Sequence, residues 1–493
     1  MIALHLPALQ VVIPLVAAAL CALLRRGVWA WLFVTAVTWV AFAIALTLLA
    51  KVTAEGVLTY QMGGWAAPWG IEYRIDRLNA LVLVIVSGIG ALVAPSLYHS
   101  VQREVAPESQ PLFYTAFLLA LTGYLGITIT GDAFNLYVFL EIASLASYTL
   151  VALGRDRRAL AAAYQYLVLG TIGATFILIG VGLLYMMTGT LNMVDLAVRI
   201  AEVGPNRTVR AAFAFIVIGT GLKLAMFPLH AWLPNAYTYA PSVVSAFLAA
   251  TATKVGVYML LRLVFGVFGA EFAYTLMPLG EILITFGLIA IVVGSLVAIF
   301  QRNLKRMLAY SSIAQIGYMA LGIGLANLDG MIGGIVHLFN DAVMKATLFL
   351  ALACVFYRTG AVDLETIRGL GRRMPWTIGA FTVAGFSLVG VPMTVGFVSK
   401  WYLLTAAVER GLWPIAVVIV GASLLALIYI WRVVEAAYFQ PPRDGASEVV
   451  EAPVAMVAPM IVLAAACLYF GLDTRFTVDV ARGAAIQLLG IGS

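Results

Sequence analysis

Five ionisable side chains lie inside long apolar stretches of this sequence: Glu141, Lys223, Lys254, Lys345 and Lys400. An ionisable group at the centre of a bilayer costs at least roughly 2.5–3.5 kcal/mol on insertion scales, and such groups usually face a bundle interior or a water-filled cavity. Burial disfavours the charged form of an amine or a carboxylic acid, so that the group can bind and release a proton near neutral pH. A series of such groups is what proton movement through an apolar layer requires.

Glu141 and Lys223 are candidates for a coupled pair. Glu141 ends the string DAFNLYVFLE, after which the stretch continues apolar. Lys223 is its natural partner in a folded bundle, because a buried pair can share or exchange a proton that neither group holds alone. A purely structural ion pair is the alternative.

Lys254 is surrounded in the sequence by the hydroxyl residues Thr251, Thr253 and Tyr258. Hydroxyls at these positions are suited to hold water near the ammonium group. The alternative is a polar seam used only for helix packing. Arg262 lies eight residues after Lys254, and we expect it to extend its charged end to the membrane surface.

His337, Asp341 and Lys345 follow one another at spacings of four, which places them along one side of a helix. Histidine titrates nearest to neutral pH, so His337 suits a relay whose members both accept and release protons. A hydrogen-bonded core histidine is the alternative. Asp341 is placed to neutralise Lys345, and such a structural clamp favours Lys254 over Lys345 as a proton carrier.

Two further observations limit the chemistry. Arg432 and Glu435 lie three residues apart near the end of an apolar stretch, and a structural ion pair is favoured for them. The cysteines have no metal-ligand spacing, and motifs of soluble catalysis are absent from the sequence. We therefore expect no metal and no cofactor.

Membrane-spanning helices must position these residues. Hydrophobic residues make up 63% of the chain and charged residues only 11%, against about 25% charged in soluble domains. The sequence predicts one all-α integral membrane domain over residues 1–493, without a soluble module. A span takes about twenty helical residues, and about fourteen apolar segments are long enough. They run approximately over 5–24, 28–50, 78–98, 112–130, 134–153, 162–187, 208–229, 240–268, 273–299, 306–325, 331–357, 376–406, 412–439 and 454–471.

Segments seven and twelve are predicted to be helices broken inside the membrane. Lys223 is followed by Pro228 in the first, and Gly390 and Pro392 are followed by Lys400 in the second. Proline removes a backbone donor and clashes with the preceding turn, so it opens a helix. The two segments are five spans apart, and a repeat with an odd number of spans inserts upside down relative to its partner. Lys400 is then the mirror of Lys223; ordinary proline kinks with lysines reaching the surface are the alternative.

The distribution of basic residues predicts the topology. Loops after odd-numbered segments carry the excess of arginine and lysine that cytoplasmic loops show, so both termini are expected outside a bacterial cell (inner) membrane. The net charge of +6 follows this topology and does not indicate nucleic-acid binding. The piece at about 51–77 is expected to form either a short hairpin on the outer face or an irregular capping loop. The basic residues of the odd loops are Arg25, Arg26, Arg103, Arg155, Arg157, Arg158, Arg302, Lys305, Arg306, Arg358, Arg368, Arg372, Arg373 and Arg443.

Four strings carry a resemblance to a known family: Gly131–Glu141, Lys223–Pro234 (KLAMFPLHAWLP), Leu304–Tyr318 and Gly390–Trp401. Together they resemble the antiporter-like membrane subunits shared by complex I and Mrp-type cation/proton antiporters. The likeness covers nearly the whole chain and is densest from about residue 112 to 440. The residues FNL at 134–136 and the overall length are most similar to the D subunit of the Mrp type.

The resemblance implies a fold and a set of roles. Segments four to eight (about 112–268) and nine to thirteen (about 273–439) would form two inverted five-helix repeats. Lys345 matches a basic position of the family's eleventh helix. The implied roles are Glu141 and Lys223 as the coupled pair of one half-channel, Lys254 as the bridge, His337 on a central hydrated axis, and Lys400 as the terminal residue of the other half-channel.

Three positions depart from the family pattern. Asp341 stands where many relatives have a second histidine, and this changes the charge balance around His337 and Lys345. Gln165 stands where a lysine is frequent, which removes a neighbour for Glu141. Asn303 replaces a frequent aspartate before segment ten.

These observations lead to one main hypothesis and two alternatives. The main hypothesis is a proton-translocating subunit of a multi-subunit antiporter that exchanges Na⁺ or K⁺ for protons, with other membrane subunits as partners. The second is a proton-pumping subunit, without its own redox centre, of a complex I-type NADH:quinone oxidoreductase or a membrane-bound hydrogenase. The third is a scaffold subunit that has lost transport.

Overall fold

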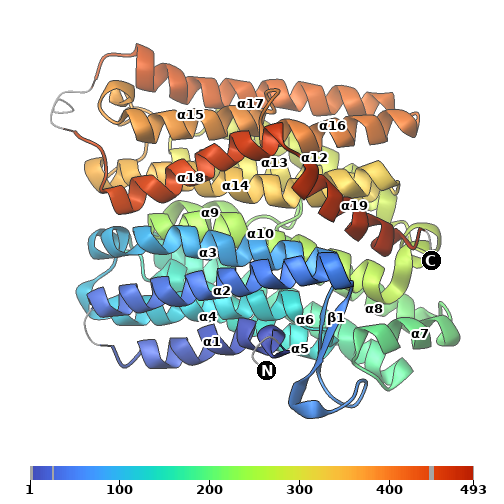
Figure 1. The fold of residues 1–493 in the computed structure, drawn as a ribbon. Helices are drawn as coiled ribbons and strands as arrows, with labels where there is room; N and C mark the ends of the chain where they lie inside the picture. Colours follow the sequence, from blue (N-terminus) through green and yellow to red (C-terminus); the bar gives the residue numbers. More distant parts are fainter. Residues whose placement is uncertain (1–3, 25–26, 443–448, 492–493) are drawn as a thin grey trace.

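The computed structural model describes residues 4–24, 27–442 and 449–491, and its helices run roughly parallel to one another (Figure 1). Ten of the described helices are long and apolar enough to cross a membrane. Four further crossings, α1, α8 with α9, α13, and α15 with α16, are shorter, interrupted or more polar. The predicted helical membrane fold with about fourteen crossings is confirmed. Arg25, Arg26 and Arg443, which the topology prediction used, lie outside the described residues.

The helix bounds agree with the predicted segments to within several residues. The helices of the crossings are α1 (Leu6–Cys21), α2 (Gly27–Glu55), α3 (Arg77–Glu104), α4 (Gln110–Ile129), α5 (Ala133–Ala152), α6 (Arg158–Thr188), α8 (Arg207–Leu224), α9 (Leu233–Tyr239), α10 (Ser242–Leu263), α12 (Leu279–Ile299), α13 (Leu304–Gly324), α14 (Leu328–Thr359), α15 (Pro375–Val389), α16 (Val395–Glu409), α17 (Trp413–Phe439) and α18 (Val454–Leu472).

The two ends of the bundle differ. One end, which we call the hairpin face, carries β1 (Leu58–Gln61), β2 (Glu72–Ile75), α7 (Met193–Val203) and α19 (Arg475–Leu489). β1 and β2 pair antiparallel from Leu58↔Ile75 to Gln61↔Glu72, so the hairpin is confirmed and the irregular loop is not. The opposite end, the basic face, carries the turns between α3 and α4, α5 and α6, α9 and α10, α12 and α13, and α14 and α15.

Two helices of the hairpin face were not predicted. α7 lies between the sixth and seventh predicted segments, where the sequence analysis placed no helix, and Asn192 caps it through the N–H groups of Val194 and Asp195. α19 buries Val478, Ala481 and Ala485, while Asp479 and Arg482 are exposed. Their regular mixture of apolar and charged residues is typical of helices that lie against a bundle, and a search for continuous apolar segments misses it.

α14 is the centre of the molecule. Its most apolar 18-residue window is 100% buried, whereas the corresponding share is 33% for α17 and for α18. α14 packs against α10, α13, α15, α16 and α18, and also contacts α3 and α19. Polar side chains on α14 are therefore shielded from lipid on every side.

Both predicted helix breaks are present. α8 ends at Leu224, the next residue Ala225 has φ +60°, and the helical path resumes at α9. α15 ends at Val389, Gly390 has φ +93°, and α16 begins at Val395. A left-handed residue stops the helical hydrogen-bond pattern, and the proline that follows each of these residues cannot donate to restore it. Each break leaves backbone carbonyls that need other donors.

Candidate functional site

A buried ion pair joins the centres of α10 and α14. The Lys254 ammonium group contacts Asp341 Oδ2, and both side chains are fully buried. Lys254 Nζ also donates to the Ala249 carbonyl oxygen at 2.7 Å. Asp341 Oδ1 is buried without a hydrogen-bond partner among the described residues. Removing either charge would leave the other uncompensated in the interior, which is strongly unfavourable.

The expected clamp between Asp341 and Lys345 is wrong. Lys345 Nζ donates to the Leu308 carbonyl oxygen at 3.0 Å and to Ser311 Oγ, both on α13. Asp341 is taken by Lys254, because α10 packs closely against α14 at this level. Lys345 is fully buried, and neutral oxygens are its hydrogen-bond acceptors.

His337 links α13, α14 and α16. Its Nδ1 lies 2.7 Å from Ser399 Oγ, and its Nε2 lies 3.0 Å from Gln315 Oε1. The amide oxygen can only accept, so the Nε2 atom carries the proton in this arrangement and Nδ1 accepts from the serine hydroxyl. The Tyr318 ring lies 5.7 Å from the His337 ring and 4.9 Å from Lys400 Nζ, so the imidazole and the lysine of the second break share this neighbour.

Lys400 occupies the carbonyls that the second break exposes. Its Nζ donates to the carbonyl oxygens of Leu388 at 3.0 Å and Val389 at 2.8 Å, and to Ser423 Oγ at 2.9 Å. The amine also lies 4.9 Å from the centre of the Tyr318 ring. Lys400 is buried, and no carboxylate lies within ion-pair distance of it among the described residues.

Lys223 has neutral partners of a different kind. Its Nζ donates to Ser144 Oγ at 2.8 Å and Tyr148 OH at 3.3 Å, both on α5. Among the described residues no ion pair joins Lys223 to Glu141, which is half-buried three residues before Ser144. A cavity of about 20 Å³ lies against Lys223 and Ser144, and one water needs about 10–15 Å³. Glu141 does not line this cavity, so the room for a water lies beside Lys223 and Ser144 and not between the two predicted partners.

Arg262 and Arg432 have other partners than predicted. Arg262 does not extend to the surface: its Nη2 forms an ion pair with Asp76 Oδ2 at 2.7 Å and also donates to Asn79. Asp76 caps α3 by accepting from the Asn79 N–H at 3.0 Å, so this cluster fastens α10 to α3. The predicted Arg432–Glu435 pair is not formed in the described part of the chain, because Arg432 contacts the Ile299 carbonyl oxygen and Glu435 is exposed.

The structure thus brings most of the predicted residues onto one polar axis and adds others that sequence reasoning missed. Lys254, Asp341, Lys345 and His337 lie around α14, and Lys400 lies beside His337. Ser144 and Tyr148 stand three and seven residues after Glu141, a spacing that places the three side chains on one face of a helix. The sequence therefore contained a signal for these two residues. The contributions of Gln315, Ser399 and Ser423 left no such signal, because isolated polar residues in spans are common. The hydrogen-bond partners that the sequence did not identify are Ser144, Tyr148, Ser311, Gln315, Ser399 and Ser423.

Comparisons with known proteins place this geometry in context. A family model described as NADH:quinone oxidoreductase/Mrp antiporter, TM matches residues 130–426. The chain is 43% identical over 485 residues to NADH-quinone oxidoreductase subunit N of Desulforudis audaxviator (strain MP104C), covering 95% of this chain and 96% of the relative. It is 29% identical over 482 residues to the D subunit of the Na(+)/H(+) antiporter of Bacillus subtilis (strain 168), covering 98% and 96%. A chain in the structure of the Mrp complex from Dietzia sp. DQ12-45-1b matches with a TM-score of 0.90 and 26% identity, covering 99% of this chain and 98% of that one.

Proposed function

The chain belongs to the NADH:quinone oxidoreductase/Mrp antiporter family, and we propose that it is the proton-translocating subunit of a multi-subunit antiporter exchanging a monovalent cation for protons. Protons pass between the buried residues through intervening water. The relay consists of Glu141, Lys223, Lys254, His337 and Lys400. Na⁺ is the exchanged cation that the name of the Bacillus relative favours.

The single observation that carries this proposal is the fully buried Lys254–Asp341 pair at the centre of the bundle. An ion pair gives a membrane helix no advantage over apolar packing, because both charges lose their hydration. It does provide a position where one proton can be held or released according to the charge of its neighbours. Asp341 Oδ1, which lacks a protein donor among the described residues, supports the binding of a water at this point.

The lysines on either side of the pair are suited to give up their protons. Lys223, Lys345 and Lys400 donate to hydroxyl and carbonyl oxygens and have no carboxylate within ion-pair distance among the described residues. Neutral acceptors stabilise an ammonium group less than a carboxylate does, and burial disfavours its charge. Each of these amines can therefore alternate between neutral and charged forms as protons pass.

The two helix breaks divide the route into two halves. We place the first inverted repeat at about 112–268 and the second at about 273–439, with Lys223 and Lys400 at corresponding breaks. His337 connects the central pair to Lys400 through Ser399, since the imidazole accepts from this hydroxyl on one side of the ring. Its second nitrogen donates to Gln315. Lys345, which lies on α14 and contacts α13, is a further member of the relay, because it lacks the expected clamp with Asp341.

Orientation and assembly follow from the same premise. We place the basic face toward the cytoplasm of a bacterial cell and both termini outside. The similar chain in the Dietzia structure is part of an Mrp complex, and we propose that this chain likewise functions beside other membrane subunits. The half-buried carboxylate Glu141 supports this, because a carboxylate at membrane depth is unfavourable against lipid.

The identity of 43% to an NADH-quinone oxidoreductase subunit favours a second candidate. In this alternative the chain pumps protons for a redox complex and has no redox centre of its own. Gentle purification of the tagged chain and identification of the bound proteins separates the two: small antiporter subunits support the first, and quinone- or hydrogen-linked subunits support the second.

The transport proposal is tested by Lys223→Ala and Lys400→Ala in the assembled complex. Inverted vesicles receive a pulse of NaCl or KCl, and the internal pH is followed. Each variant is expected to lose transport by on the order of 10²-fold, the usual contribution of a positioned proton-transfer group. Arg199→Ala, in α7 outside the crossings, is the matched control. Unchanged transport with normal assembly would contradict the proposal and support a scaffold.

A further inference from the structure

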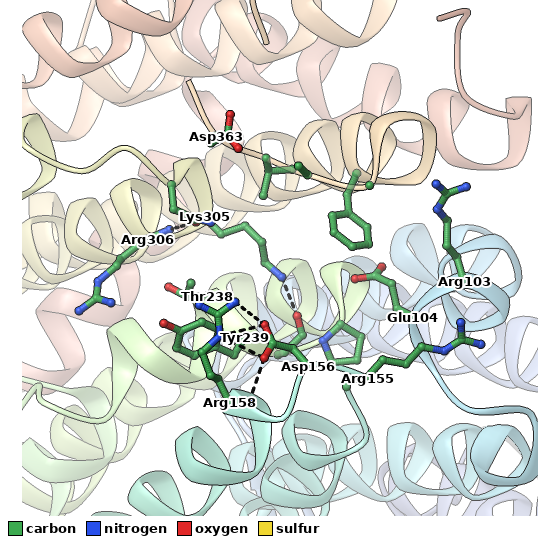
Figure 2. Close-up of a pocket in the computed structure, with 18 residues that line it drawn as sticks. Arg103, Glu104, Arg155, Asp156, Arg158, Thr238, Tyr239, Lys305, Arg306 and Asp363 are labelled. Carbon is green, nitrogen blue, oxygen red and sulfur yellow. Dashed lines mark hydrogen bonds and ion pairs between the residues drawn. The ribbon is translucent and has the colours of Figure 1, made fainter. Parts of the chain in front are cut away.

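A cavity of about 480 Å³ opens on the basic face between the two halves of the molecule (Figure 2). Its walls come from the end of α3, the α5–α6 turn, the α9–α10 turn, the start of α13 and the end of α14. Most of the residues that line it are charged or polar. Neither the relay residues nor the helix breaks line it.

The floor of the cavity contains a buried lysine that the relay does not use. Lys305 is only 5% exposed, and its Nζ donates to the Ala240 carbonyl oxygen at 2.6 Å. No carboxylate lies within ion-pair distance among the described residues, although Glu104 and Asp156 are close enough to influence its charge. Figure 2 shows the Lys305 side chain crossing from α13 toward the α9–α10 turn, with Glu104 on the other side of the space.

Glu104 fixes the beginning of α10, the helix that carries Lys254. Its Oε2 accepts from both the N–H and the hydroxyl of Ser242 at 2.9 Å, and its Oε1 accepts from Ser100 at 2.5 Å. The residue at the N-cap position of α10 is Pro241, whose side chain offers no cap. A carboxylate from α3 therefore replaces the missing cap.

The lining of the cavity is rich in arginine. Arg103, Arg155, Arg158 and Arg306 line it together with the acids Glu104, Asp156 and Asp363. Asp156 is already paired with Arg158 at 2.6 Å, and Asp363 Oδ1 accepts from Thr366. Fixed guanidinium groups cannot be deprotonated, and they disfavour the charged form of a nearby amine. A lysine amine in the same cavity can exchange protons with water.

A short path leads from Lys305 to the central pair. Lys345 Nζ contacts Leu308 and Ser311, which are three and six residues beyond Lys305 on α13. Three residues of helix rise about 4.5 Å, less than one turn. Asp341, the partner of Lys254, lies one turn from Lys345 on α14. Lys305, Lys345 and the Lys254–Asp341 pair thus follow one another in this order from the cavity toward the centre of the bundle.

From this arrangement we propose that the cavity is the proton mouth of the chain on the basic face and that Lys305 exchanges protons with the water in it. When a cation enters from the basic face, the Lys345 ammonium passes its proton through water to the neutral Lys305 amine, and the resulting Lys305 ammonium gives it to a cavity water, which leaves as hydronium. The net step moves one proton out to the basic face and regenerates neutral Lys305, and the reverse step takes one proton inward. This inference rests on the proposed function, because it connects that relay to the basic face.

The decisive variant is Lys305→Arg in the assembled complex. Arginine keeps the charge and can donate to the Ala240 carbonyl, but it does not release its proton. Cation-driven proton transport in inverted vesicles is expected to fall by on the order of 10²-fold, and Lys305→Met is expected to fall equally. Arg302→Met, on the same turn but outside the cavity lining, is the control. Transport by Lys305→Arg equal to that of the unmodified protein would overturn the inference.

An accessibility measurement tests the mouth without relying on transport. Lys305→Cys is exposed to a membrane-impermeant maleimide in inverted and in right-side-out vesicles. Labelling is expected only in inverted vesicles, where the proposed cytoplasmic face is outside; background is low because the native Cys21, Cys354 and Cys467 are buried. Labelling only in right-side-out vesicles, or in neither, would overturn the proposed mouth on the basic face. If Lys223→Ala and Lys400→Ala lose transport while Lys305→Arg keeps it, only this inference fails; if the first two keep transport, the proposed function itself fails.

Discussion

Lys400 Nζ lies 2.8 Å from the carbonyl oxygen of Val389, the last residue of α15, so the lysine that follows the second break binds the backbone that the break exposes. The glycine between them is tightly enclosed. A Cβ added to Gly390 would lie 2.9 Å from Lys400 Cδ, and the φ of +93° is unfavourable for any residue with a side chain.

Gly390→Ala is therefore expected to displace Lys400. Strain of about 1–3 kcal/mol is expected from the backbone conformation alone, together with a marked loss of transport. Gly421→Ala, on α17, is the control, since a Cβ there meets nothing within 4 Å. Thermal unfolding of the purified complex and vesicle transport measure the two effects. Equal behaviour of the two variants would contradict the assigned contact.

Variants of the Lys254–Asp341 pair are expected to affect thermal stability and transport differently. Asp341→Asn leaves the Lys254 ammonium buried without its counter-charge, which costs about 3–5 kcal/mol of stability. The double variant Lys254→Met with Asp341→Leu removes both charges and is expected to recover most of the thermal stability. Transport is expected to stay lost in both variants. A double variant that transports protons normally would show that the pair has only a packing role.

The His337 contacts predict graded effects. Ser399→Ala removes the donor to Nδ1 and leaves the ring held only through Nε2 and Gln315, so transport is expected to fall by roughly tenfold. Ser312→Ala is the control, because its hydroxyl donates to the Leu308 carbonyl within its own helix. Initial rates in vesicles, normalised to the amount of assembled complex, measure the difference. A loss in the control as large as that in Ser399→Ala would argue against a specific link.

We expect that the Asp156 carboxyl does not contribute to the pH dependence of transport. Hydrogen bonds from Arg158 hold the pKa of the Asp156 carboxyl below its ordinary value. A lowered folded-state pKa means that the stabilising contribution exists above the unfolded pKa of about 3.9 and is lost only as the pH falls through the lower folded value. The ratio of transport by Asp156→Asn to that by the unmodified protein is thus expected to be constant between about pH 6 and 9. A ratio that changes with pH in this window would show that Asp156 titrates during transport.

The sequence predicted the elements of this fold better than the partners of its charged residues. Long apolar segments and the prolines near Lys223 and Lys400 placed the crossings and both breaks, because these signals are local. The predicted pairing of Asp341 with Lys345 was wrong, because a spacing of four residues identifies neighbours on one helix but does not reveal the contact with Lys254 on α10. Arg262 was expected at the surface for the same reason: Asp76 is distant in the sequence, and only the packing of α3 against α10 brings it near.

The two helix breaks are closed by donors of different chemistry. At the first break, Trp232 Nε1 donates to the Leu222 carbonyl oxygen at 2.9 Å. An indole N–H does not titrate, so this interruption keeps its geometry whatever protons pass nearby. At the second break the donor is the Lys400 amine, whose protonation changes in the proposed relay. Of the two breaks, only the second is therefore closed by a hydrogen-bond donor that can change its charge. We expect any change of backbone conformation that follows proton transfer to begin at that break.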